Sequence, residues 1–369
     1  MRTARTEPLD AARPLALRSP GSSRTVAEPA RLRPAVLAGA LCALVGAAAV
    51  GLVVGPTAVS PAGALEEVVH RVLGLRLGGG LHGVEASIVW QLRAPRIVLA
   101  VLVGGTLAAA GAAYQGVFRN PLADPYLLGV AAGAGLGATI AIVAGAEGAT
   151  GPVAWVPLAA FVGALGAVGL TYFLGARPRS PSPATLLLAG VAVSSMLTAV
   201  QTYIQLRDTQ TLQDVYTWIL GDLATAGWHD VVLLAPYSAL SVAVLFAHRR
   251  HLDVLAVGDD EAASLGIDVG RTRLVVLAAA SLGTAAAVSV SGLIGFVGII
   301  VPHAVRMAGG DSYRSVLPLS FLVGGAFLVL ADLVARTALA PAELPIGIVT
   351  AALGGPFFLL VLRQRSGRR

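Results

Sequence analysis

The ionisable side chains that could do chemistry are few in this 369-residue sequence, and none forms a catalytic pattern. His303, in the stretch PHAVR, has no second histidine or carboxylate three or four positions further on, so we predict no metal site there. The sequence contains no HExxH or GxSxG motif and no paired catalytic carboxylates within an apolar segment. All 26 basic residues are arginine, whereas a P-loop needs a lysine at the nucleotide phosphates. We therefore predict a protein that is not an enzyme, has no cofactor, and leaves any ATP hydrolysis to a partner.

Carboxylates are concentrated in the stretch GDDEAASLGIDVG, residues 258–270. Its first three acidic residues, at 259–261, suit the first turn of a helix, where negative charge is favourable. Gly266 is expected to end that turn, and Asp268 to cap the next helix. A small apolar face is predicted from Ala262, Ala263 and Leu265. So short a helix is unstable alone in water, so it must pack on its own bundle or dock into another protein.

The elements around these residues must be membrane helices, because hydrophobic residues make up 56% of the chain and charged residues only 12%. A soluble domain carries about 25% charged residues, and the mean hydropathy here is +0.78. Runs without charge mark the spans, each of which needs about 20 apolar residues. These runs are residues 34–57, 97–118, 125–146, 148–176, 180–206, 231–248, 274–305, 315–331 and 344–362.

The run 274–305 is too long for one span, and the small residues at 289–292 offer a turn inside it. Dividing it there predicts an all-α integral membrane protein with ten transmembrane helices. Ten spans place 20 of the 26 arginines on the cytoplasmic side, and the excess of positive charge on that side favours this count. Residues 1–33 are expected to form a disordered cytoplasmic tail, and residues 34–365 the membrane domain, with both termini in the cytoplasm.

Arginines are found at the outer ends of predicted spans, and each is expected to need an anionic or hydrogen-bonding partner. Arg93 and Arg96 precede the second span, and they could anchor to lipid headgroups or receive carboxylates from another protein. Asp332 and Arg336 lie four positions apart on one helix, so a local ion pair is expected beside any functional role. On the cytoplasmic side, FRNPLADP at 118–125 predicts a rigid turn, because its two prolines interrupt the helix.

Six motifs in this order resemble the permease subunit of bacterial ABC importers for iron–siderophore complexes, haem and cobalamin. The resemblance covers about residues 35 to 365. The motifs are LRAPR, GGTLAAAGAAYQGVFRNPLADPYLLGV, VGDDEAASLGIDVG, SGLIGFVGIIVPHAVR, ADLVARTALAPAELPIG and GIVTAALGGPFF.

The resemblance implies ten helices per subunit and roles for particular residues. Arginines of the family that receive acidic residues of the binding protein fall at Arg93, Arg96 and Arg336. Residues of the cytoplasmic gate fall at Asn120, Pro121 and Leu122. The short coupling helix that docks in the ATPase falls at Gly258, Asp259, Asp260, Glu261, Ala262, Leu265 and Gly266.

The resemblance also implies the partners: a second permease copy or a homologue, two cytosolic ATPases, a periplasmic or lipid-anchored binding protein, and membrane lipid, without nucleic acid. The expected location is the cytoplasmic membrane of a bacterium. We expect small side chains, such as Ser194, Ser195 and Thr350, to line the pathway.

The cargo is expected to be a bulky metal chelate. A ferric siderophore is the choice on family frequency, with haem and cobalamin as alternatives. A proton- or sodium-driven carrier is the rival class, but such carriers place chains of ionisable groups in mid-membrane, and His303 and Asp332 form no such chain.

Overall fold

The computed structural model describes residues 33–57, 59–75, 81, 83–146, 154–175 and 183–366, and all regular elements among them are helical. Predictions for the N-terminal tail, and for the starts of the spans at 148 and 180, lie outside these residues. In the first half the elements are α1 (Pro34–Val53), α2 (Pro61–Leu73), α3 (Val84–Ser87), the π-helix η1 (Ile88–Arg93), α4 (Ala94–Phe118), the 3-10 helix η2 (Pro125–Leu128), α5 (Val130–Val143), α6 (Trp155–Gly175) and α7 (Pro183–Arg207). In the second half they are α8 (Leu212–Leu220), α9 (Trp228–Ala247), α10 (Arg249–Leu255), α11 (Asp259–Ser264), α12 (Val269–Ser291), α13 (Val297–Gly309), α14 (Tyr313–Thr337) and α15 (Ile346–Ser366).

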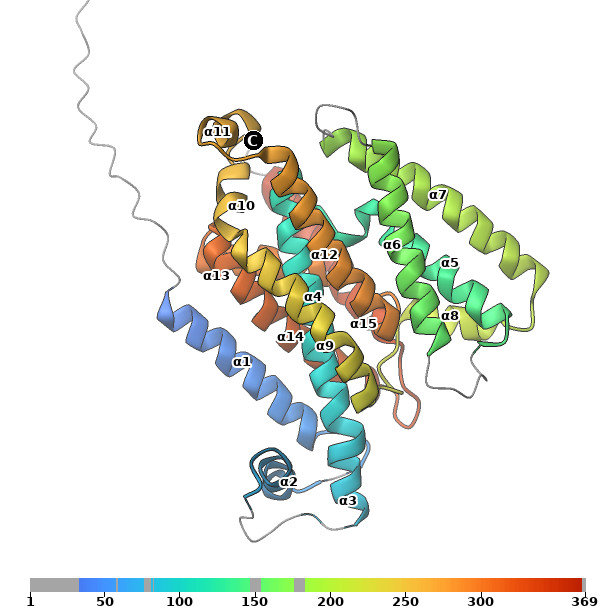
Figure 1. The fold of residues 1–369 in the computed structure, drawn as a ribbon. Helices are drawn as coiled ribbons and strands as arrows, with labels where there is room; N and C mark the ends of the chain where they lie inside the picture. The colour runs from blue at the N-terminus through green and yellow to red at the C-terminus, as the bar shows by residue number, and fades with distance from the viewer. Residues whose placement is uncertain are drawn as a thin grey trace, which may run out of the picture.

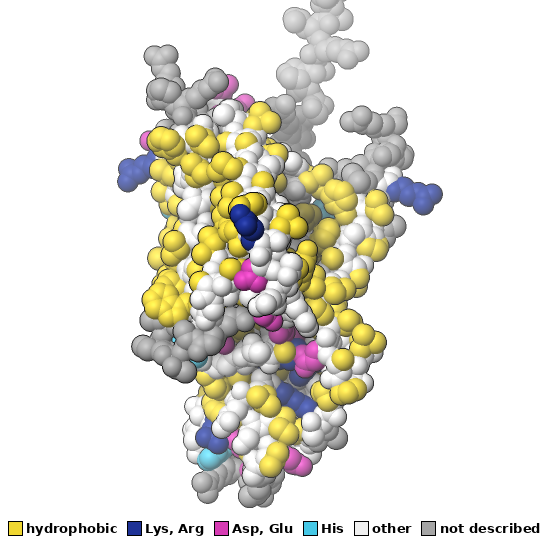
Figure 2. Space-filling model, turned by 90° about the vertical axis from the view of Figure 1, so that its right-hand side faces the viewer, with side chains coloured by type: hydrophobic (Ala, Val, Ile, Leu, Met, Phe, Trp, Pro, Cys, Tyr) yellow, Lys and Arg dark blue, Asp and Glu magenta, His cyan; other side chains and the backbone are white. Residues whose placement is uncertain are grey.

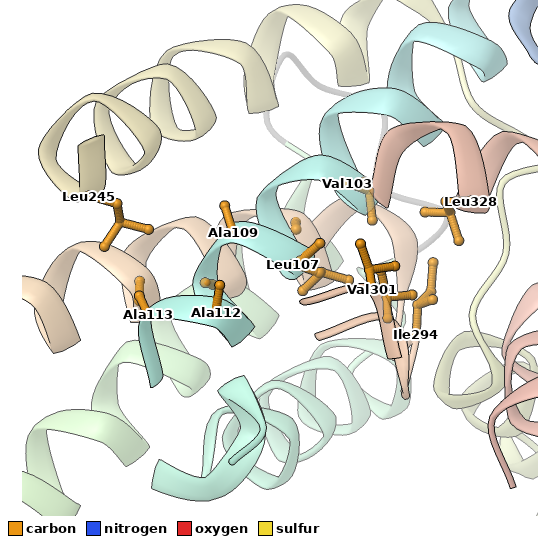
Figure 3. Close-up of a cluster of buried hydrophobic side chains, with 14 of the residues drawn as sticks. Val103, Leu107, Ala109, Ala112, Ala113, Leu245, Ile294, Val301 and Leu328 are labelled. Carbon is orange, nitrogen blue, oxygen red and sulfur yellow. The ribbon is translucent and has the colours of Figure 1, made fainter. Parts of the chain in front are cut away.

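Helix α4 runs through the centre of the bundle and is buried along nearly its whole length. Figure 1 shows α11 at one end of the bundle and α2 and α3 at the opposite end. Around α4 lie α9, α12, α13 and α14. The close-up in Figure 3 shows part of this core, with Val103, Leu107, Ala109, Ala112 and Ala113 facing Leu245, Ile294, Val301 and Leu328.

Glycines bring the central helices into backbone contact. A Cβ atom at Gly104 would lie 2.3 Å from the carbonyl oxygen of Gly324 on α14. At Gly111 it would lie 2.1 Å from the carbonyl oxygen of Gly298 on α13. Small residues at such crossings allow the close approach through which helices associate in lipid. The glycines at these positions therefore serve close helix packing.

The third, fourth and fifth predicted spans form a second group, in which α5 packs against both α6 and α7. Figure 1 shows this group beside the central bundle. Helix α12 joins the two groups, because it contacts α4 and α9 on one side and α5 and α6 on the other.

The predicted division of the run 274–305 is confirmed. Helix α12 ends at Ser291, Gly292 follows with φ 66°, and α13 begins at Val297. Gly292 suits this turn because glycine adopts positive φ without steric cost, and a Cβ there would also lie 2.2 Å from the carbonyl oxygen of Trp218.

Seven helical segments within the described ranges are long and apolar enough to cross a membrane. Three shorter apolar helices accompany them, at Val130–Val143, Val297–Gly309 and Ile346–Leu359. Large hydrophobic side chains are exposed along α1, α6, α7 and α9. Figure 2 shows hydrophobic side chains spread over the whole height of one face, as a lipid-facing surface requires.

The helix at the second predicted span begins earlier in the chain than residue 97, where the prediction placed its start. Helical structure runs from Val84 through the π-turn of η1 to Phe118. The predicted span was a run without charge, and such a run can begin only at residue 97 because Arg93 and Arg96 lie within this helix. Both arginines are tolerated there because their guanidinium groups are bonded inside the protein.

Candidate functional site

The end of the bundle opposite α11 holds a buried group of ionisable side chains. Arg96, in the first turn of α4, donates from Nε to both carboxylate oxygens of Asp332 at 2.9 and 3.0 Å. Its Nη2 atom lies 2.8 Å from Asp332 Oδ1 and 2.9 Å from Glu343 Oε2. Asp332 is only 1% exposed, whereas the side chain of Glu343 is 34% exposed. Arg96 therefore binds one buried carboxylate and one partly exposed carboxylate at the same time.

The expected pair within α14 is present but looser than the pair between helices. Arg336 Nε lies 3.7 Å from Asp332 Oδ2. Its Nη2 donates to the carbonyl oxygen of Gly51 at 2.6 Å. The sequence predicted this i,i+4 pair, and it could not show Arg96 as the principal partner of Asp332, because that contact joins residues 236 positions apart.

The last turn of α1, which binds Arg336 through the carbonyl oxygen of Gly51, also binds Arg93. Its Nη1 donates to the carbonyl oxygens of Leu52 and Val53, both at 2.8 Å, and its Nη2 donates to Thr57. Carbonyls in the last turn of a helix have no partner within the helix, and positive charge is favourable there. Arg93 and Arg336 thus cap the C-terminal end of α1.

These bonds bear on the expected docking of a binding protein. Arg93, Arg96 and Arg336 are all buried in this chain and already have acceptors. Their part in docking stays a prediction. Within the group, Glu343 is the more exposed of the two carboxylates that bind Arg96.

The predicted gate forms a tight turn after α4. Arg119 takes φ 50° as the C-cap of α4, and the carboxamide oxygen of Asn120 accepts the amide of Leu122 at 3.0 Å. Asp124 accepts the amide of Tyr126 at 2.8 Å and starts η2. These bonds from side chains to neighbouring backbone groups fix the shape of the turn around Pro121, as the prediction of a rigid turn requires.

The stretch 258–270 folds largely as predicted. Asp259, Asp260 and Glu261 form the first turn of α11, Gly266 follows with φ 78°, and the carboxylate of Asp268 accepts the amide of Arg271 at 2.9 Å. The residues of the predicted apolar face divide between the two alternatives, because Ala262 is buried against the chain itself, whereas Ala263 and Leu265 are exposed. Ala262 faces inward because α11 packs on α10 and α12.

Leu265, in contrast, is 70% exposed. An isolated exposed leucine is ordinary on a protein surface, but this one stands on a charged loop at the end of the bundle. It offers an apolar contact to a partner without loss of packing inside the chain.

The residues expected to line the pathway do not share one environment. Ser195 is exposed on α7, whereas the hydroxyl of Ser194 lies near Gly129 of the same chain. Thr350 on α15 is fully buried and donates to the carbonyl oxygen of Gly347 at 3.2 Å. Of the three, only Ser195 is exposed, and the lining of the pathway by these residues stays a prediction.

A cavity of about 930 Å³ lies between α6, α8, α9 and α12. Sequence reasoning missed it, because its residues are far apart in the chain and form no motif. Its polar and aromatic lining comes from Trp155, Asp214, Trp218, Asp222, His229 and Asp230.

No group of three or more His, Cys, Asp or Glu side chains is placed to hold a metal ion within the described part of the chain. The ring of His303 packs edge-on against Phe357 at 5.8 Å between centroids.

The long apolar helices and their glycine-mediated packing define a multi-pass membrane protein. The chain belongs to the FecCD transport family, whose model matches residues 41–364. It is accordingly a permease of an ABC importer for metal chelates, not an enzyme, and the ATPase is a separate subunit. Permeases of this family work with ATPase and substrate-binding partners.

Similarity extends over most of the chain. The cobalamin import permease BtuC of Halobacterium salinarum is 47% identical, over 78% of this chain and 77% of its own length. The hemin permease HmuU of Yersinia pestis is 42% identical, over 76% of this chain and 85% of its own. A solved structure of an inward-facing metal-chelate type ABC transporter superposes with a TM-score of 0.78 at 30% identity, covering 90% of this chain and all of that one.

Proposed function

We propose that this permease carries a ferric siderophore or a closely related iron chelate across the cytoplasmic membrane of a bacterium. Relatives at 35% to 37% identity whose names specify ferric citrate or an iron chelate support this cargo. The observation that carries the transport proposal is α11, a charged helix of one and a half turns that presents Leu265 at the end of a membrane bundle.

We infer that ten helices cross the membrane, with both termini in the cytoplasm. The seven long apolar helices together with the three shorter ones support this count. The cytoplasmic excess of arginine supports the orientation. It is tested by single cysteines in a variant without Cys42, the one native cysteine. A membrane-impermeant maleimide should label position 265 only from the cytoplasmic side and position 84 only from the outside, and the reverse labelling would overturn the orientation.

At the inner end, we propose that two ATPase subunits bind α11 of this chain and of a second permease copy or homologue. ATP binding would move the two coupling segments and favour one of two states of the bundle, because each state binds the partners differently. Asn120, Pro121 and Leu122 would close the pathway on the cytoplasmic side. The fixed turn geometry of these residues supports that role.

At the outer end, a periplasmic or lipid-anchored binding protein would deliver the chelate. Its acidic side chains would reach the group formed by Arg93, Arg96 and Arg336 by displacing Glu343, the exposed carboxylate there. The cavity between α6, α8, α9 and α12 would belong to the outer entrance. Its volume lies within the range of small-molecule sites, about 300–1,000 Å³.

The experiment is transport into proteoliposomes that contain the permease with its ATPase, supplied with the binding protein. The probes are a labelled ferric hydroxamate chelate, haemin and cyanocobalamin. ATP-dependent uptake of the ferric chelate, competed by its unlabelled form, is the expected result. Uptake that persists without the ATPase would overturn the transport mechanism in favour of an ion-driven carrier.

Cobalamin is the second candidate, because the relative named for cobalamin import is 47% identical. Both cargoes are bulky chelates, so the permease alone does not distinguish them. Saturable binding of cyanocobalamin to the cognate binding protein, with no binding of the ferric chelate, would replace iron by cobalamin in the proposal.

A further inference from the structure

Asp259, the first residue of α11, bonds to two arginines from different parts of the chain. Arg273, on α12, donates from Nη2 to Asp259 Oδ1 and Oδ2 at 3.0 and 3.1 Å. On the other side, Arg119 Nη2 lies 3.5 Å from Asp259 Oδ1. One carboxylate thus connects the predicted coupling helix with α12 and with the C-cap of α4.

The two arginines differ in burial. The side chain of Arg273 is 2% exposed, so its charge is fixed inside the protein and depends on its partners there. The side chains of Arg119 and Asp259 are 39% and 38% exposed. A half-exposed pair contributes little to folding stability and can form and break as the elements move. Arg273 is suited to hold α11 in place, and Arg119 to respond to its position.

Arg119 directly precedes Asn120, the first residue of the predicted gate. Its φ of 50° is unusual for a residue other than glycine, asparagine or aspartate, so its side chain leaves α4 in a direction set by this cap. Helix α11 packs on α10 and α12. The bond from Asp259 to Arg119 is therefore a direct link from α11 to the residue beside the gate.

We propose that Arg119 is a positioning residue that transmits movement of α11 to the turn at residues 120–122. The inference rests on the proposed function, since it takes α11 as the coupling helix and this turn as the gate. When an ATPase displaces α11, Asp259 moves with it, and Arg119 conveys the displacement to the end of α4. The backbone of Asn120 follows because it is the next residue in the chain.

The test compares Arg119→Gln with Arg119→Lys in proteoliposomes that contain the ATPase and the binding protein. The readout is the ratio of labelled chelate imported to ATP hydrolysed, with whichever chelate the wild type imports. In Arg119→Gln we expect a fall of about two- to fivefold, the range that a half-exposed ion pair supports. The rate of ATP hydrolysis and the melting temperature should stay as in the wild type, and Arg119→Lys should restore the ratio. Arg271→Gln removes an exposed arginine nearby and serves as the control for net charge.

A second test bridges the two positions. In a variant with Cys42→Ser, the double change Arg119→Cys and Asp259→Cys should lower the ratio, and a short bis-maleimide that joins the two cysteines should restore it. A bridge that blocks uptake would show that the gate and α11 must separate, and a ratio unaffected by Arg119→Gln would show that the pair transmits nothing. Either outcome would overturn the role proposed for Arg119, and ATP-dependent uptake by the wild type would still support the proposed function. Absence of ATP-dependent uptake in the wild type would instead count against the proposed function.

Discussion

Arg96 on α4 and Asp332 on α14 form a buried two-point ion pair at the end of the bundle opposite α11, with N–O distances of 2.8 to 3.0 Å. Helices α4 and α14 also share their most extensive packing, so the pair fixes the relative height of two central helices. Removal of one partner from such a pair leaves the other buried and uncompensated, at a cost of about 3–5 kcal/mol.

We therefore expect Asp332→Asn to destabilise the protein strongly, because it leaves both Arg96 and Arg336 without their inner carboxylate. The measurement is the midpoint of thermal unfolding in detergent. Glu343→Gln is the matched control, since this carboxylate is partly exposed and its loss should cost about 0–1 kcal/mol. Equal losses of thermal stability in the two variants would show that the buried pair of Arg96 and Asp332 stabilises the protein no more than the exposed contact of Glu343.

Glu343 gives a separate prediction for docking. If a carboxylate of the binding protein has to reach Arg96, Glu343→Gln should raise the affinity of the permease for the binding protein. The gain should be about two- to fivefold, because a competing exposed ion pair is removed. Binding measured by surface plasmon resonance on permease in nanodiscs provides the check. Weaker binding in this variant would mean that Glu343 itself belongs to the docking surface.

The glycine contacts give a prediction about packing. Gly104→Ala should lower the unfolding temperature and the yield of monodisperse protein, because the new Cβ would lie 2.3 Å from the carbonyl oxygen of Gly324. Gly166→Ala on α6 is the control, since a Cβ there meets nothing within 4 Å. The control change should be neutral or stabilising by up to about 1 kcal/mol, as for alanine in an open helical position. A harmless Gly104→Ala would contradict the close approach of α4 and α14.

The exposed side chain of Leu265 leads to a prediction about the affinity of the permease for its ATPase. Leu265→Ala should leave the melting temperature of the permease unchanged, because the side chain is 70% exposed. Burial of a leucine in an interface contributes about 1.5–3 kcal/mol, so affinity for the ATPase should fall about tenfold or more. Val84→Ala, another exposed apolar residue but at the opposite end, is the control. Unaltered co-purification with the ATPase in Leu265→Ala would remove the coupling role of this side chain.

Much of this architecture follows from local sequence. The small residues at 289–292 predicted the break between α12 and α13, and the spacing of acids and glycine in 258–270 predicted the caps of α11 and α12. These features depend on near neighbours in the chain, where turn and cap preferences are decided.

Contacts between distant residues were beyond such reasoning. Arg96 was identified as a charge in need of a partner, but nothing local pointed to Asp332 or to the carbonyls at the end of α1 that bind Arg93. The inward orientation of Ala262 likewise depends on where α10 and α12 lie, which the stretch 258–270 does not encode.

The contact between Gly104 and Gly324 has a mechanical consequence. The nearest side-chain atoms at this crossing are the Cβ atoms of Leu328 and Ala108, so the two helix backbones pack closely against each other and leave no free space between them. The ion pair of Arg96 with Asp332 joins the same two helices again, at the end of the bundle that carries α2 and α3. The two central helices are thus held together both at mid-length and at one end, and we expect them to move as one rigid unit.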